Sequence, residues 1–171
     1  MSMPTLEEHL ASLAPDQQWQ VAWQMAAAAL PIWEAYARDG QLRYVDSVVG
    51  MVHDVAPDLL ARALAEAKVL VDTPDMDSLP HGTGRMHAIQ SEFLDPIVAL
   101  QDMDWELPAP VQLVFYAVSN LVDALAGQAQ TVFSESTRYV VVNQAVDALQ
   151  QTGLLHEGAI RAILYQFGER A

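Results

Sequence analysis

The side chains that could do chemistry in this chain are its five histidines and 22 carboxylates, because the sequence contains no cysteine. A metal site in a helical bundle is built from carboxylates and Glu-x-x-His pairs on facing helices. The sequence has no such pair, no His-Glu-x-x-His motif and no Gly-x-Ser-x-Gly motif. It also lacks the lysine-containing phosphate loop of nucleotide-binding proteins. We therefore expect no catalytic residue, no metal and no cofactor.

Two weaker readings of the same residues stay open. His53 stands beside Asp54 and could assist proton transfer. A lone histidine at the edge of a helix is more often structural or solvated. The acid-rich runs 72–77 and 102–106 lack the glycine and the spacing of an EF-hand, which leaves weak cation binding there as an alternative.

Acidic residues dominate the charge of the chain, with 22 acids against 8 bases and a net charge of −14. Nine acids and two bases lie between Glu66 and Glu106, so half of the net charge falls in this segment. Contacts with phosphates need clustered Lys and Arg, and we therefore expect no nucleic-acid partner. Such a field can steer a basic protein into encounter. The alternative is that it only keeps the protein soluble.

Two acidic loops are expected, near residues 72–84 and 102–110. The first is rich in Pro, Gly and Asp, and structureless connections of this length are often functional. The second places Trp105 between two acids, where it is either a binding hot spot or an anchor that holds the loop on the core. The candidate binding residues of the two loops are Asp72, Asp75, Asp77, Asp102, Asp104, Trp105 and Glu106.

Apolar residues recur with helical spacing along most of the chain, which predicts an all-α fold. Thr5 and Glu8 form a capping box at the first helix. Pro31 and Pro96 are expected to bend or restart helices. The β-branched run 139–142 also suits a strand, but its continuation favours a helix. The expected helices cover about residues 5–13, 16–30, 31–38, 42–55, 57–71, 86–100, 111–125, 139–152 and 155–167. They form a single-domain bundle of about seven to nine helices over residues 1–171.

The helix expected at 42–55 has two faces. Valines form an apolar stripe, and a polar stripe carries the further candidate binding residues Asp46 and Asp54 with Gly50 between them. Glycine inside a helix costs about 1 kcal/mol relative to alanine, so Gly50 suggests a close packing partner.

The sequence predicts a cytoplasmic protein without membrane contact. The first residues, MSMPTLEEHLASLAP, lack the basic region of a signal peptide. The longest apolar tract, residues 21–33, is interrupted by Gln24 and Pro31 and is shorter than the ~20 residues of a membrane span. The absence of cysteine fits a reducing compartment.

The stretch ALPIWEAYA (29–37), followed by LRYVDSVVG (42–50), resembles the start of small all-helical immunity proteins of bacterial polymorphic-toxin systems. It also resembles a related group of helical bacterial proteins of unknown function. The resemblance covers about the first 70 residues and is carried by Leu30, Pro31, Trp33, Glu34, Tyr36 and residues 46–50.

The resemblance implies that the chain is not an enzyme, since these families share no catalytic residues. It implies stoichiometric binding of a cognate toxin with a basic surface, through the two acidic loops and the Asp46/Asp54 face. Two alternatives remain: a helical metal- or nucleotide-dependent hydrolase, and a self-associating scaffold that forms a homodimer.

Overall fold

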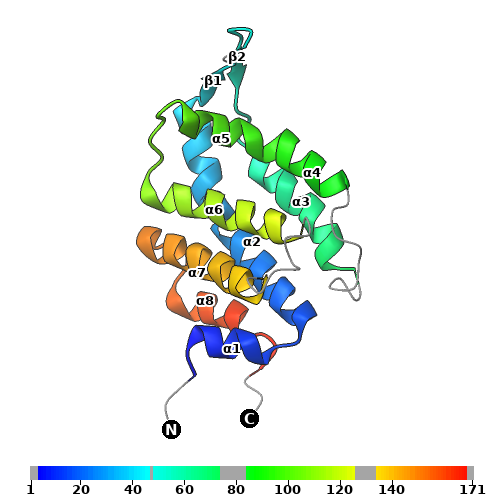
Figure 1. Cartoon of the computed structure of the whole chain (residues 1–171). Helices are drawn as coiled ribbons and strands as arrows, with labels where there is room; N and C mark the ends of the chain where they lie inside the picture. The colour runs from blue at the N-terminus through cyan, green and yellow to red at the C-terminus, as the bar shows by residue number, and fades with distance from the viewer. Residues whose placement is uncertain (1–3, 47, 74–83, 126–133, 169–171) are drawn as a thin grey trace.

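The computed structural model describes residues 4–46, 48–73, 84–125 and 134–168, and it shows a helical bundle that carries a small hairpin at one end (Figure 1). The predicted all-α fold is confirmed apart from this hairpin. The elements, in order, are α1 (Leu6–Ser12), α2 (Pro15–Gly40), β1 (Arg43–Val45), β2 (Val52–Asp54), α3 (Leu59–Val71), α4 (Gly84–Ile89), the π-helical segment η2 (Gln90–Leu94), α5 (Asp95–Asp102), α6 (Ala109–Leu125), α7 (Ser134–Thr152) and α8 (Glu157–Leu164).

Helix α2 is the centre of the bundle and packs against α3, α6, α7 and α8. Trp19 and Trp33 are fully buried on its inner face. Trp23 is half-buried, and its indole N–H donates to the carbonyl of Leu64 on α3 at 2.8 Å. The helices expected at residues 16–30 and 31–38 thus form one helix, whose tryptophans lie in the core of the fold.

The interruption expected at Pro31 does not end this helix. Helix α2 continues through Pro31 to Gly40, and the proline itself is exposed. A proline inside a helix removes one backbone hydrogen bond. Burial of Trp33 and Ala37 in the turns that follow offsets this loss, so the helix continues.

The other local predictions have mixed outcomes. The capping box is confirmed, because the Thr5 hydroxyl accepts from the N–H of Glu8 while the Glu8 carboxylate accepts from the N–H of Thr5. Residues 139–142 are helical, as the continuation of the run indicated. The change expected at Pro96 takes the form of the π turn at residues 90–94, after which α5 begins with Pro96 in its first turn. Pro96 cannot donate to the preceding turn, and the wider turn takes up the mismatch.

The helix predicted for residues 42–55 is wrong. The structure has an antiparallel hairpin there, with Tyr44 paired to His53 and Val45 to Val52. Gly50 has φ +69° and closes the turn, and an added Cβ would meet nothing within 4 Å. Its role is a left-handed turn conformation, not the close helix packing that the sequence suggested. Valines favour strands, and no core surface lies over these to hold them in a helix.

Candidate partner-binding surface

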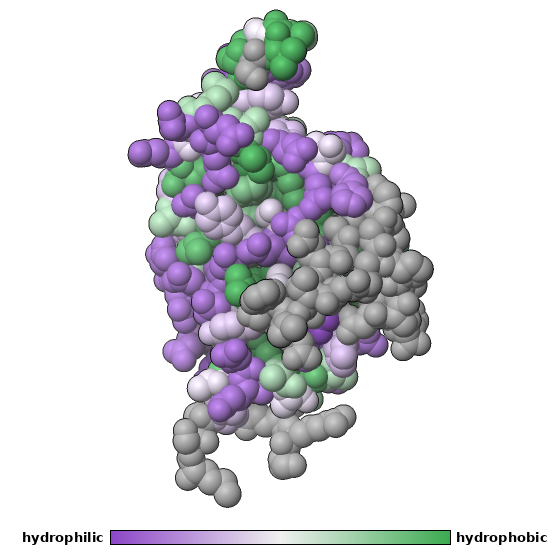
Figure 2. Space-filling view, in the orientation of Figure 1, coloured by the Kyte–Doolittle hydropathy of each residue, from purple (hydrophilic) through white to green (hydrophobic). Residues whose placement is uncertain are grey.

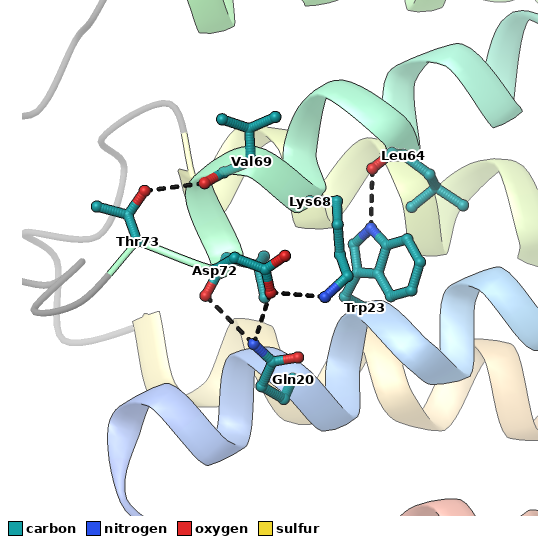
Figure 3. Close-up of polar contacts among 8 residues, drawn as sticks. Gln20, Trp23, Leu64, Lys68, Val69, Asp72 and Thr73 are labelled. Atoms are coloured by element: carbon teal, nitrogen blue, oxygen red, sulfur yellow. Dashed lines mark hydrogen bonds and ion pairs between the residues drawn. The ribbon is translucent and has the colours of Figure 1, made fainter.

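The first predicted acidic group is only partly described, because Asp75 and Asp77 lie outside the described residues. Asp72 follows the last residue of α3. Its carboxylate accepts from Lys68 Nζ at 2.6 Å and from Gln20 Nε2 at 3.1 Å (Figure 3). These two hydrogen bonds hold the pKa of Asp72 below its usual range, and the bond from Lys68 has the larger effect on it. Asp72 therefore ties the end of α3 to α2, and its carboxylate already has partners within the chain.

The second predicted acidic group stands in the connection from α5 to α6. The side chains of Asp102, Asp104 and Glu106 are exposed. Trp105 is half-buried, and its indole N–H donates to the Tyr36 hydroxyl at 3.0 Å. Of the two readings of Trp105, the structure favours the anchor that holds the loop on the core.

The third predicted pair, Asp46 and Asp54, lies on the hairpin. The Asp46 carboxylate accepts from the backbone N–H groups of Val48 at 2.7 Å and Val49 at 3.2 Å. These bonds lower the pKa of Asp46 and organise the turn. Asp54 pairs with Arg43 Nε at 2.9 Å across the two strands. The two residues do not form the helical stripe that was expected.

The fold brings the second and third groups together and leaves Asp72 apart from them. The backbone N–H of Val45 donates to Met103 Sδ at 3.2 Å, which places the hairpin beside the end of α5. Asp72 lies at the far end of α3, a helix of 13 residues and so about 20 Å long. The described acids of the predicted surface are thus divided, and residues 43–46, 48–54 and 102–106 form one part, called here the hairpin end.

The apolar side chains of the hairpin are candidate partner-binding residues that the prediction from the sequence did not include. They are exposed to solvent, and Figure 2 shows them as a hydrophobic cap on the part that projects from the bundle. Their exposed fractions are Val45 44%, Val48 89%, Val49 64%, Met51 59% and Val52 61%. These five residues are called the apolar tip. The sequence held a signal for them, since Asp46 and Gly50 are turn residues flanked by β-branched ones.

A separate cleft of about 460 Å³ lies between the π segment and α6. The Gln90 amide donates to the carboxylate of Asp123 within it, and the Ser91 hydroxyl donates to Asp95 at 3.4 Å. Burial raises the pKa of the Asp123 carboxyl, and the hydrogen bond from Gln90 opposes this in part. The cleft is lined by His87, Gln90, Ser91, Leu94, Asp95, Val98, Ser119 and Asp123. Its oxygen atoms suit a hydrogen-bond donor or a cationic group.

Substitution of Asp123 by asparagine is expected to raise the midpoint of thermal unfolding at pH 7 by about 1–2 °C, once solvent screening is allowed for. A carboxyl whose pKa is raised in the folded state stabilises the fold when protonated. That contribution is complete below the unfolded-state pKa of about 3.9 and is lost as the pH rises through the folded-state pKa. At pH 7 the wild type is therefore destabilised by the partial burial of the ionised Asp123 carboxylate, and the variant lacks this destabilisation.

Thermal unfolding at pH 4 and pH 7 checks this expectation. The gain of Asp123→Asn should shrink at pH 4, because the raised pKa leaves a larger fraction of the wild-type carboxyl protonated there than at pH 7. Asp147→Asn is the matched control, because Asp147 is exposed on α7 and should show no such difference between the two pH values. An equal gain at both pH values would contradict the role given to burial of Asp123.

Two further features of the described residues bear on function. No three His, Asp or Glu side chains gather there as a metal site. No helix in this part of the chain is long and apolar enough to cross a membrane.

No family model, curated protein or solved structure matches the chain. Inference about function therefore rests on the surface of the chain itself.

Proposed function

We propose that this chain is an immunity protein, which binds a cognate bacterial toxin domain one-to-one in the cytoplasm and neutralises it. The observation that carries this proposal is the hairpin end. There, the hairpin that bears the exposed apolar side chains contacts Met103, in the segment that exposes the carboxylates of Asp102, Asp104 and Glu106. Soluble proteins seldom expose contiguous apolar groups unless these contact a partner.

The charge of the chain supports a basic partner. With a net charge of −14, the protein attracts proteins of opposite charge and repels further copies of itself. Carboxylates at the rim of an apolar contact mainly accelerate association and select the partner. An inhibitor that acts by binding its target in a stoichiometric complex can use an apolar contact with carboxylates at its rim, and it requires no catalytic group.

The experiment that tests the function begins with the genes beside that of this chain, one of which is expected to encode the toxin domain. Co-expression is expected to restore growth of cells that produce the toxin domain, and light scattering of the purified mixture should give a one-to-one complex. If the wild-type chain neither protects the cells nor forms the complex, the proposed function is wrong.

Charge reversal then tests the surface. The pair Asp102→Lys and Glu106→Lys is expected to slow association about tenfold at low salt and to flatten its salt dependence. Asp104 is left unchanged because its φ of +59° disfavours most side chains. Glu7→Lys with Asp147→Lys changes the net charge equally, on exposed positions of α1 and α7, and should have a much smaller effect. Equal effects of the two pairs would mean that net charge alone steers the partner.

A further inference from the structure

The turn of the hairpin exposes two apolar side chains. Beside Asp46 and Gly50, which are residues that turns favour, Val48 and Val49 stand at the turn and are 89% and 64% exposed. Exposed β-branched residues in a turn satisfy neither the local geometry nor the burial of apolar surface. Positions at which a sequence departs from such rules without gain in stability are often functional sites.

Hydrogen bonds organise the backbone of this turn. The Asp46 carboxylate accepts from the N–H groups of Val48 and Val49, and the Gly50 N–H donates to the Asp46 carbonyl at 2.8 Å. The Asp46 N–H in turn donates to the carbonyl of Met51 at 2.8 Å. A partner would therefore pay little conformational entropy to order the tip, which favours tight binding.

The base of the hairpin is fixed to the bundle. Leu42 and Val55, one at each end, are buried in the core, and the Val55 N–H donates to the Leu42 carbonyl at 2.9 Å. Between base and turn, the rings of Tyr44 and His53 stack with centroids 5.0 Å apart. The apolar tip is thus held away from the bundle on a supported two-stranded stem (Figures 1 and 2).

We propose that the apolar tip inserts into an apolar recess of the toxin domain whose rim carries Lys and Arg. This inference rests on the proposed function and names the chemistry of the partner at the hairpin end. Desolvation of the exposed valines requires an apolar recess. The exposed carboxylates of Asp102 and Glu106 beside the hairpin favour a basic rim.

The same charges disfavour two other partners that could cover the apolar tip, namely a second copy of the chain and an anionic lipid surface. A second copy of the chain would bring an equally acidic hairpin end, and the two would repel each other. An anionic lipid surface attracts basic segments and would repel these carboxylates. A basic protein with an apolar recess satisfies both parts of the surface.

Insertion assigns different kinetic roles to the two parts of the hairpin end. The apolar tip becomes buried only in the final complex, so its loss should accelerate dissociation. The carboxylates act over a longer range before contact, so their loss should slow association. This division can be measured.

The test is the rate of dissociation of the full chain from the toxin domain encoded beside its gene. Val48→Thr with Val49→Thr keeps the branched shape and replaces one methyl group of each side chain with a hydroxyl. It is expected to increase koff by about 10- to 100-fold with kon little changed. The matched control is Val69→Thr with Val140→Thr, because both valines are exposed on helices of the bundle. This pair should leave koff unchanged, and thermal unfolding verifies that all variants are folded.

Each other outcome has a definite meaning. If the wild type binds the toxin domain and the tip variant dissociates at the wild-type rate, insertion of the tip is wrong while the proposed function stands. If the wild type does not bind at all, the proposed function fails and this inference fails with it. Light scattering at two concentrations tests self-association of the chain. Sedimentation with phosphatidylcholine–phosphatidylserine vesicles tests binding to an anionic lipid surface. Self-association or vesicle binding that depends on Val48 and Val49 would overturn the assignment of the partner.

Discussion

Substitution of Trp33 by alanine is expected to lower the free energy of unfolding by about 3–5 kcal/mol. Trp33 is fully buried on the central helix, and its ring centroid lies 6.4 Å from that of Phe115 on α6. Removal of the indole loses its burial and leaves a cavity between helices that cannot close completely. The loss is large against a typical total stability of about 5–15 kcal/mol. Urea unfolding should show a lower midpoint.

Two further variants sharpen this expectation. The indole N–H of Trp33 is buried and has no hydrogen-bond partner among the residues that the structure describes. Trp33→Phe removes this unpaired donor and leaves a smaller cavity, and it should cost clearly less than Trp33→Ala. Trp105→Ala is the control for a half-buried tryptophan. If Trp105→Ala proves as destabilising as Trp33→Ala, the central position given to Trp33 in the core is wrong.

Replacement of Ala26 by leucine is expected to cost about 1–3 kcal/mol for the opposite reason. Ala22, Ala26 and Ala29 are fully buried along the face of α2 that meets the bundle. A larger side chain there must displace its neighbours, because protein interiors are packed as densely as organic crystals. The same measurement of urea unfolding tests this variant.

Ala35→Leu provides the matched control, since Ala35 is exposed on the same helix. Alanine and leucine have similar helix propensities, so a difference between the two variants reports packing and not helix formation. Equal changes in the midpoint would show that Ala26 has room beside it, contrary to its complete burial.

Much of the bundle could be predicted from local pattern. Helical spacing located the tryptophans of α2 and the apolar faces of α3, α6 and α7, because a surface helix must bury one face. The capping box between Thr5 and Glu8 was equally local, since its two hydrogen bonds join residues three positions apart.

The hairpin shows where local pattern was insufficient. The valines at positions 45, 48, 49, 52 and 55 fit one face of a helix, and they also fit strands around a turn. A helical face is stable only if another surface covers it. In the structure only Val55 of these reaches the core, while Asp46 and Gly50 satisfy a turn. The absence of a covering surface could not be read from this segment alone.

The sequence by itself determined the acidic charge, the apolar periodicity and therefore a helical bundle, because each of these follows from composition and short-range spacing. The tertiary structure alone decided which carboxylates already have a hydrogen-bond or ion-pair partner within the chain. It joins Asp72 to Gln20 of α2 and pairs Asp54 with Arg43 across the hairpin. It also placed the hairpin beside residues 102–106 through the contact of Val45 with Met103. Such contacts join residues far apart in the chain, and they form only when the packing of the core brings their elements together.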